Sequence, residues 1–378
     1  MNTEEKAESL FRQGIESLES REFTKAIELL DNALELKPDL GGAWCCRGLA
    51  FGHLEQYEES LTSFDQALKY NVLDLQAWLN RGLVLYQWQR FEDSLANFTQ
   101  LIKLEHFHYE AWFHKGNCLL ELKRELEAIP CFDKCLELNP DYYKAYSNRG
   151  QAQANLGRLK AGLRSFDKAI AIQPDEAQLW YNRGCALLFA KQDAEALSNF
   201  DKALEIEPKH MESWLNRGVV MDHLGRKDES FACFEKALEI NPLETHAWNN
   251  RGVFLRKEGE WKKAVASYDK AIECDPNNHE AWDNRGYALA LMGKVNLAIA
   301  SINRSLEIKP DHANGMYNKG FCYGLQKKMK LAVSWIEEAI KLNQEKYLEL
   351  ARTDEDLDIL RRNKHFKSLL RKYKAVES

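Results

Sequence analysis

The sequence predicts an all-α protein built from stacked, antiparallel helical hairpins. A 34-residue internal period and a scarcity of helix-breaking residues are the two observations behind this prediction. Only eight prolines and twenty glycines interrupt the 378 residues. Seven tryptophans recur at intervals of 34 residues or a multiple of 34, and a glycine follows each of them four residues later: Trp44, Trp78, Trp112, Trp180, Trp214, Trp248 and Trp282.

The same register extends over ten units, which account for residues 1–346. Tyr146 fills the gap in the tryptophan series, and Leu10 and Met316 take the equivalent place at the two ends. Positions 1 to 34 denote places within a unit, so that tryptophan stands at position 4 and glycine at position 8. The predicted units span residues 7–40, 41–74, 75–108, 109–142, 143–176, 177–210, 211–244, 245–278, 279–312 and 313–346.

Each unit has the residue sizes of a closely packed hairpin. Positions 8 and 20 hold small residues and position 27 is mostly alanine, whereas positions 4 and 24 are mostly large and apolar. Small residues facing large ones let the two helices of a unit approach closely. Proline at position 32 in seven units stops the second helix, because proline cannot continue it.

Three residues depart from this pattern. Val72 and His106 replace the proline of position 32 in units 2 and 3, and Pro130 lies inside the second helix of unit 4. Proline there removes one backbone donor. We expect a tolerated local distortion, and the alternative is a hinge or a partner-binding notch around residues 104–135.

The period stops after residue 346, and residues 347–378 are predicted to form capping helices with a basic tail. Thr353 and the three acids that follow it suggest a helix start. Residues 361–374 contain seven basic residues, no acid, and apolar residues at helical spacing. Because a repeat array needs a polar end, we favour a cap over a contact with nucleic acid or lipid.

Composition and charge exclude several classes of protein. The net charge of −6 gives no basic footprint, so no nucleic-acid partner is expected. No apolar run approaches the roughly 18 residues of a membrane span, so no membrane insertion is expected. The acidic N-terminal residues do not resemble a signal peptide. Nine irregularly placed cysteines are not a secreted disulfide framework, and a cytoplasmic location is predicted.

The order W-x3-G, small residue, aromatic, alanine and proline resembles the tetratricopeptide repeat (TPR) family, and the local sequence is similar to its bacterial form. The resemblance implies a right-handed superhelical solenoid. Its first helices would line a concave groove, and its second helices would lie outside.

Asparagine recurs at position 6, which faces the groove in the TPR family, and the row resembles the asparagine ladder of the O-GlcNAc transferase superhelix. An amide side chain both donates and accepts, so it can bind the backbone of an extended peptide without reading its sequence. The alternative is that these amides satisfy neighbouring helix ends. The predicted partner-binding asparagines are Asn80, Asn148, Asn182, Asn216, Asn250, Asn284 and Asn318.

Apolar residues recur at positions 5, 9 and 12, which also face the groove in this family. Contiguous exposed apolar area usually marks a partner site, although neighbouring repeats could cover part of it. No position 5 is lysine in the regular units, so the family's clamp for charged chaperone tails is not expected. The predicted apolar partner-binding residues are Leu79, Leu83, Tyr86, Phe113, Tyr181, Leu215, Val219, Val253, Tyr287, Tyr317 and Phe321.

Two columns of opposite charge run through the units. Position 7 is arginine or lysine in nine units, and position 25 is acidic in eight. We interpret these columns as ion pairs between packed helices, each contributing about 0.2–1 kcal/mol.

The sequence contains no phosphate-binding loop, nucleophile elbow or zinc-protease motif, so the chain is predicted not to be an enzyme and to need no cofactor. His106 with His108 and Cys131 with Cys135 are weak metal signals, and surface and packing roles are preferred. The predicted function is a non-catalytic protein–protein interaction scaffold or adaptor. An assembly factor or chaperone, and a regulatory subunit of a separately encoded enzyme, are the alternatives. The sequence determines neither the partner nor the oligomeric state.

Overall fold

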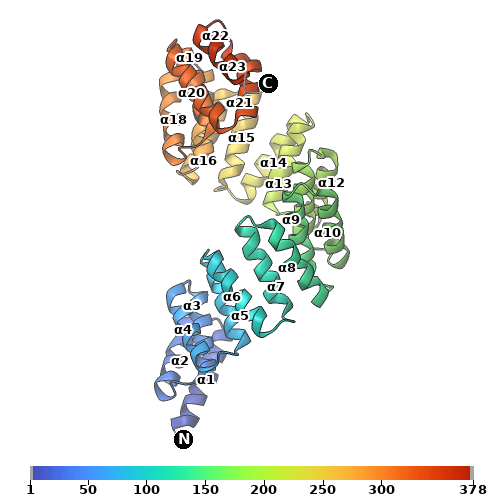
Figure 1. The fold of residues 1–378 in the computed structure, drawn as a ribbon, viewed down its shortest axis with the longest axis vertical. Helices are drawn as coiled ribbons and strands as arrows, with labels where there is room; N and C mark the ends of the chain where they lie inside the picture. The colour runs from blue at the N-terminus through green and yellow to red at the C-terminus, as the bar shows by residue number, and fades with distance from the viewer. Residues whose placement is uncertain (1–2, 375–378) are drawn as a thin grey trace. The chain divides into compact units, whose positions relative to one another are not determined.

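The computed structural model describes residues 3–374, and all regular elements in this range are helices, which confirms the all-α prediction (Figure 1). We call the odd-numbered helices up to α19 the A helices and the even-numbered ones up to α20 the B helices. The A helices are α1 (Thr3–Glu19), α3 (Gly41–His53), α5 (Leu75–Gln87), α7 (Tyr109–Glu121), α9 (Tyr143–Asn155), α11 (Ala177–Phe189), α13 (Met211–His223), α15 (Thr245–Lys257), α17 (His279–Leu291) and α19 (Ala313–Leu325).

The B helices follow the A helices after short turns. They are α2 (Phe23–Leu36), α4 (Tyr57–Tyr70), α6 (Phe91–Leu104), α8 (Glu125–Leu138), α10 (Leu159–Ile172), α12 (Asp193–Ile206), α14 (Lys227–Ile240), α16 (Trp261–Cys274), α18 (Val295–Ile308) and α20 (Met329–Leu342).

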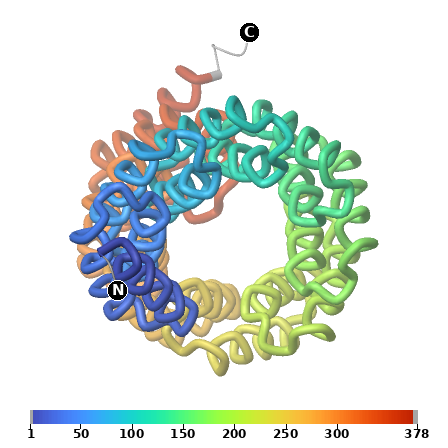
Figure 2. Tube along the Cα trace, turned by 90° about the horizontal axis from the view of Figure 1, so that it is seen from below, coloured from blue at the N-terminus to red at the C-terminus, as the bar shows by residue number. Residues whose placement is uncertain are grey.

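The chain divides into two compact units, residues 1–191 and residues 192–378. Within each unit the helix pairs stack side by side in chain order, blue to green in the first and green to red in the second (Figure 2). Consecutive A helices of a unit contact each other directly, whereas its consecutive B helices make no comparable contact over the described residues. The A helices therefore lie on the inner, concave side of each unit.

Glycine at position 8 lets the two helices of a hairpin approach. A Cβ atom added to Gly252 would lie 2.5 Å from Cε1 of Tyr268, and one added to Gly116 would lie 2.6 Å from Cε1 of Phe132. Both rings are fully buried. Serine at position 20 adds a bond across the hairpin, since Oγ of Ser94 donates to the carbonyl of Gly82 at 2.8 Å.

The turns between hairpins keep one geometry whether or not proline is present. Nε1 of the position-4 tryptophan donates to the carbonyl of position 32. This bond measures 2.8 Å from Trp44 to Pro38 and 2.9 Å from Trp78 to Val72. The backbone carbonyl therefore fixes the turn, and the side chain at position 32 can vary.

Ion pairs join neighbouring hairpins, as the charge columns predicted. The position-7 arginine pairs with the position-25 acid sixteen residues earlier, as when Nε of Arg285 lies 2.6 Å from Oδ1 of Asp269. The same guanidinium donates to Ser301 in its own hairpin at 2.6 Å. The seven pairs are Arg47–Asp31, Arg81–Asp65, Arg149–Asp133, Arg183–Asp167, Arg217–Asp201, Arg251–Glu235 and Arg285–Asp269.

The structure shows how Pro130 and Thr353 fit into their helices. Pro130 lies on the exposed side of α8, and the helix continues without a break from Glu125 to Leu138. The helix start expected at Thr353 is wrong, because Thr353 is the last residue of α21. Asp354 instead caps the next turn, its side chain accepting from the amide of Asp356 at 3.0 Å.

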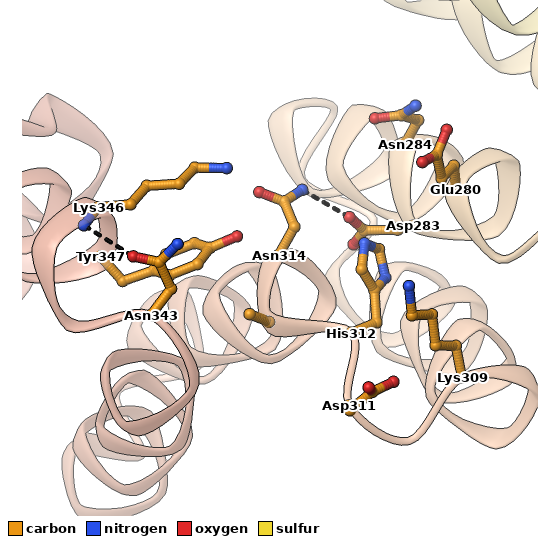
Figure 3. A pocket seen from close by; sticks show the side chains of 11 residues that line it. Glu280, Asp283, Asn284, Lys309, Asp311, His312, Asn314, Asn343, Lys346 and Tyr347 are labelled. Carbon is orange, nitrogen blue, oxygen red and sulfur yellow. Dashed lines mark hydrogen bonds between the residues drawn. The ribbon is translucent and has the colours of Figure 1, made fainter. Parts of the chain in front are cut away.

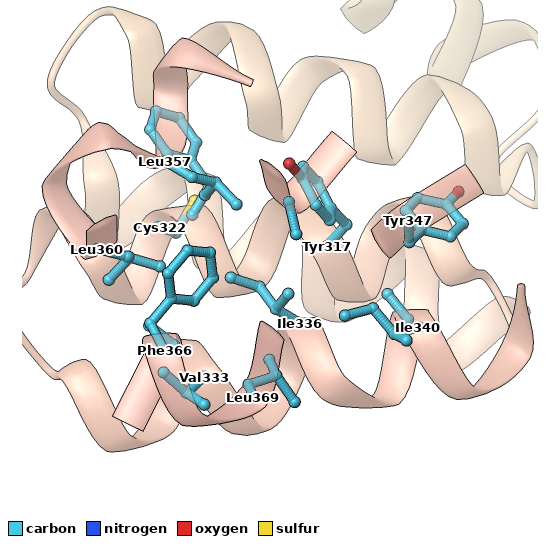
Figure 4. Packing of buried hydrophobic residues seen from close by; sticks show 14 of the residues in the cluster. Tyr317, Cys322, Val333, Ile336, Ile340, Tyr347, Leu357, Leu360, Phe366 and Leu369 are labelled. Atoms are coloured by element: carbon cyan, nitrogen blue, oxygen red, sulfur yellow. The ribbon is translucent and has the colours of Figure 1, made fainter. Parts of the chain in front are cut away.

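The segment after α20 closes the last hairpin. It comprises α21 (Gln344–Thr353), the 3-10 turn η1 (Glu355–Leu357), α22 (Asp358–Arg361) and α23 (Lys364–Lys374). Figure 4 shows Leu357, Leu360 and Phe366 gathered against the last hairpin, and all three are fully buried. Lys364, Lys367 and Arg371 are exposed, so the basic face of α23 points to solvent.

Candidate functional site

The side chains that were predicted to bind a partner all lie on the A helices, and all are partly or almost fully buried. None of the seven predicted asparagines is exposed: Asn80 and Asn318 are buried, and the other five are half-buried. This burial follows from the close approach of consecutive A helices. The amides therefore lie in the seam between neighbouring repeats, where their polar atoms need partners.

Several of these amides tie one A helix to the preceding one. Nδ2 of Asn182 donates to Oγ of Ser147 at 3.1 Å, and Nδ2 of Asn284 donates to Oδ1 of Asn249 at 3.0 Å. Asn318 donates in the same way to Asp283 at 3.0 Å. In each case the acceptor stands at position 5 of the preceding repeat. These bonds give part of the row a structural role, although the acceptors are side chains of the preceding A helix and not the helix ends named in the alternative.

Other members of the row differ. Nδ2 of Asn148 donates to Oδ1 of Asn117, at position 9 of the preceding repeat, at 2.8 Å. Oδ1 of Asn80 accepts from Gln76 at 3.2 Å, while its Nδ2 is buried without a partner in the described chain. Asn216 is half-buried in α13. Position 5 of the repeat before Asn250 is the apolar Leu215, which offers no side-chain acceptor. The side chain of Asn250 makes no hydrogen bond within residues 3–374.

The predicted apolar residues fall into two groups. Five are almost fully buried between repeats and offer little surface: Leu79, Phe113, Leu215, Tyr317 and Phe321. Six are half-buried and present part of their side chains on the concave side: Leu83, Tyr86, Tyr181, Val219, Val253 and Tyr287.

The groove positions of the last two repeats are covered by the chain itself. Oη of Tyr317 donates to Oδ2 of Asp354 at 2.8 Å, and Oη of Tyr287 donates to Asp356. Burial raises the pKa of both tyrosines, and the hydrogen bond to the neighbouring aspartate raises it further. A partner could contact the hydroxyl groups of Tyr287 and Tyr317 only if residues 354–360 moved away.

A cavity of about 260 Å³ opens between α9 and α11, in repeats 5 and 6. Its lining residues are Gln151, Ala154, Asn155, Phe166, Tyr181, Asn182, Cys185, Ala186 and Phe189. Phe189 is 78% exposed, although it is a large apolar residue. The sequence prediction included Tyr181 and Asn182 but missed Phe189, which stands at position 13, outside the positions that face the groove in the family.

A second cavity, of about 390 Å³, lies beside the N-termini of α17 and α19 (Figure 3). Its wall contains the carboxylate of Asp283, which is 1% exposed and accepts from Nδ2 of Asn314 at 2.7 Å. Burial raises the pKa of Asp283 to about 6, against the lowering effect of Asn318 and Asn314. Glu280, Lys309 and Lys346 also line this cavity, so it carries charges of both signs.

The histidine and cysteine pairs considered as weak metal signals have structural contacts. Nδ1 of His106 lies 2.7 Å from the carbonyl of Ile102, and Nδ1 of His108 accepts from the amide of Ala111. Cys131 and Cys135 are buried in the core of the fourth hairpin. No group of three or more metal-ligating side chains occurs among residues 3–374. None of the helices placed by the structure combines the length and apolar character of a membrane span.

Comparison with protein-family models gives matches over most of the chain. Models described as tetratricopeptide repeat match residues 45–94, 109–142, 131–164, 177–210, 211–243, 233–266, 279–312 and 313–346. A model described as TPR repeat matches residues 254–293. A comparison with curated proteins returns no significant match.

Two solved structures show the same fold at low sequence identity. The APC/C hetero-tetramer Cut9–Hcn1 is 16% identical, with 94% of this chain and 76% of that chain covered and a TM-score of 0.56. A tetratricopeptide repeat protein from Parabacteroides merdae is 18% identical, with 70% and 98% covered and a TM-score of 0.53. YrrB, described as a TPR protein with an unusual peptide-binding site, is 22% identical over 49% of this chain and 95% of its own, with a TM-score of 0.41. The repeats, the fold and the family models agree, and the chain belongs to the tetratricopeptide repeat family.

Proposed function

We propose that the protein is a non-catalytic scaffold that holds an extended or helical segment of a partner protein against the concave side of its A helices. TPR proteins are typically protein–protein interaction scaffolds, and the chain has the fold for this role. The nine free cysteines suit a reducing compartment such as the cytoplasm.

One observation carries this proposal: the chain already holds a polypeptide segment at its own groove positions. Residues 354–360 lie against Tyr287 and Tyr317, at positions 9 and 5, with two hydrogen bonds from the tyrosine hydroxyls. Equivalent positions in the other repeats, such as Val219 and Val253, remain half-buried. Side chains of the same kind in the same places support binding of a segment from another protein.

The test is a native pull-down from cells, followed by crosslinking and mass spectrometry. We expect a partner whose crosslinks lie on the A helices. Combined replacement of Asn182, Asn216, Asn250 and Asn284 by alanine should weaken its capture. Asn250→Ala alone is the cleaner variant, because Asn250 makes no hydrogen bond that its loss would break.

The matched control replaces four exposed lysines at position 26 of the B helices by glutamine, in repeats 5 to 8, three of which carry one of the four asparagines. These are Lys168, Lys202, Lys236 and Lys270, and capture should be unchanged. Circular dichroism must show that every variant remains helical. Crosslinks confined to the B helices, or full capture by the folded asparagine variant, would contradict the proposed surface.

A further inference from the structure

The cavity between α9 and α11 differs chemically from the surrounding groove. Ala154 and Phe166 form part of its lining, and Phe189 adds an exposed aromatic ring. Position 13, where Phe189 stands, is polar or charged in the seven repeats from 1 to 8 other than its own. An exposed phenylalanine beside a cavity is costly to leave in water, and it is typical of the anchor sites where partners bind.

The polar part of the lining is neutral. Gln151, Asn155 and Asn182 supply amide groups, and no charged side chain is among the residues that line this cavity. Amides can bond the backbone of an extended segment on either side of an inserted side chain. A charged side chain would find no opposite charge in the cavity and would lose its hydration there. The lining therefore selects an uncharged, apolar group.

The chain's own C-terminal segment shows which side chain the groove accepts. A Cβ atom added to Gly324, at position 12 of the last repeat, would lie 3.3 Å from Cδ2 of Leu360. Leu360 is thus seated directly on a small position-12 residue and is fully buried. Ala154 is the small position-12 residue beneath the open cavity in repeat 5. The two places are equivalent in the repeat, and only one is filled by the chain.

We propose that the cavity between α9 and α11 receives one bulky aliphatic or aromatic side chain from an extended segment of the partner. This inference rests on the proposed function and adds the chemistry of the anchor. The exposed amides of Gln151 and Asn155 hold the backbone of the segment, and Phe189 covers the inserted side chain. The anchor contributes specificity, because an apolar cavity discriminates among side chains whereas an amide that bonds the backbone accepts any sequence.

The experiment uses a displayed library of random 12-residue linear peptides, selected on the full-length protein. We expect the enriched peptides to share one leucine, isoleucine, methionine or aromatic residue. Ala154→Leu should weaken their binding at least about 10-fold, because its side chain occupies the cavity. Leucine already stands at position 12 in repeats 1, 4 and 6, so the substitution suits the hairpin.

Two further variants separate binding from folding. Phe189→Ser changes an exposed residue and should weaken binding several-fold without loss of helicity. Gln87→Leu adds an apolar side chain at an exposed position 13 in repeat 3, away from the cavity, and should leave peptide affinity unchanged.

Other outcomes overturn the inference in distinguishable ways. Enriched peptides that bind the wild-type protein and Ala154→Leu equally would show peptide binding without this anchor, which overturns the inference but not the proposed function. Failure to enrich any peptide would count against both proposals. Sedimentation that shows a wild-type dimer and a monomeric Ala154→Leu variant would assign the cavity to a second copy of the chain.

Discussion

At the scale of single residues, Asp283 is the only charged side chain at position 5 in the ten repeats. Its carboxylate is almost fully buried, and the donors that reach it are the neutral amides of Asn314 and Asn318. Burying a carboxylate without a cation is costly, which is why burial raises the pKa of Asp283 to about 6. Asn249, at position 5 of the preceding repeat, accepts from Asn284 without carrying a charge.

This difference predicts how Asp283→Asn changes the pH dependence of stability. Between about pH 4 and pH 6 the unfolded chain releases the proton of Asp283 while the folded chain keeps it, so the contribution of this group to the stability of the wild-type protein falls as pH rises. Asp283→Asn does not titrate. From pH 4 to pH 7 the free energy of unfolding of the variant should gain about 2–3 kcal/mol relative to wild type.

Urea unfolding at pH 4, 5, 6 and 7 measures this change, with Asp311→Asn at an exposed residue of the same cavity as the control. A difference between wild type and Asp283→Asn that stays constant over this range would mean that burial does not perturb the carboxyl group.

The residue pattern predicted where the asparagines lie but not what they bind. Asn182, Asn284 and Asn318 donate to position-5 acceptors 35 residues earlier, namely Ser147, Asn249 and Asp283. The polar residues at position 5 were the available signal. The family resemblance predicts that position 6 faces the groove. The hydrogen bond to the preceding repeat depends instead on how closely two consecutive A helices approach, which the sequence does not give.

At the scale of the hairpin, packing depends on glycine against a ring. The Gly252–Tyr268 contact has no space for even a methyl group, because the added Cβ would meet three ring carbons within 3.0 Å. Gly157, in the turn between α9 and α10, has a φ of +73° and no atom within 4 Å of an added Cβ. The two glycines thus serve different purposes, one for packing and one for the turn.

Gly252→Ala should lower the free energy of unfolding by about 2–3 kcal/mol, because the buried ring of Tyr268 must move. Gly157→Lys should cost less than about 1 kcal/mol, since the turn has open space and the chain already uses lysine there. Lys123, Lys191 and Lys327 stand at the equivalent position with φ of 57–59°. Thermal unfolding of both variants tests the pair, and equal losses would mean that size at position 8 is not the constraint.

The hairpins were predictable because every repeat contains the same pattern of small and large residues. In each repeat the helix propensities and the packing between helices therefore favour the same structure. The C-terminal segment has no such redundancy. Its path depends on Asp354 and Asp356 meeting Tyr317 and Tyr287, which precede them by more than thirty residues. Local signals alone therefore predicted a helix start at Thr353, whereas α21 ends at this residue.

At the scale of the whole molecule, successive repeats are joined by a repeated ion pair wherever the residues allow it. Lysine replaces arginine at position 7 in Lys115 and Lys319, where position 25 of the preceding repeat is the uncharged Thr99 or Asn303. These two junctions lack the ion pair between positions 7 and 25 that joins the repeats at the other junctions. Stability of an array is a sum over repeats and their interfaces, so each junction contributes separately.

Installing the missing pair should therefore strengthen one junction. Thr99→Asp combined with Lys115→Arg should raise the free energy of unfolding by about 0.5–1 kcal/mol. The reverse exchange, Asp65→Thr with Arg81→Lys, should lower it by a similar amount. Double-mutant cycles measured by urea unfolding isolate the coupling. Purely additive effects of the single substitutions would mean that the pairs do not stabilise the junctions.

The folded-back segment at residues 354–360 also bears on how such an array can change its length. It is hydrogen-bonded to Tyr287 and Tyr317 in the last two repeats, so its position depends on these particular repeats. A duplicated 34-residue unit inserted upstream would leave both hydrogen bonds intact. A unit appended after residue 346 would separate the segment from its tyrosines. Growth by duplication is thus directed to the interior of the array, and the last two repeats act as a fixed terminus.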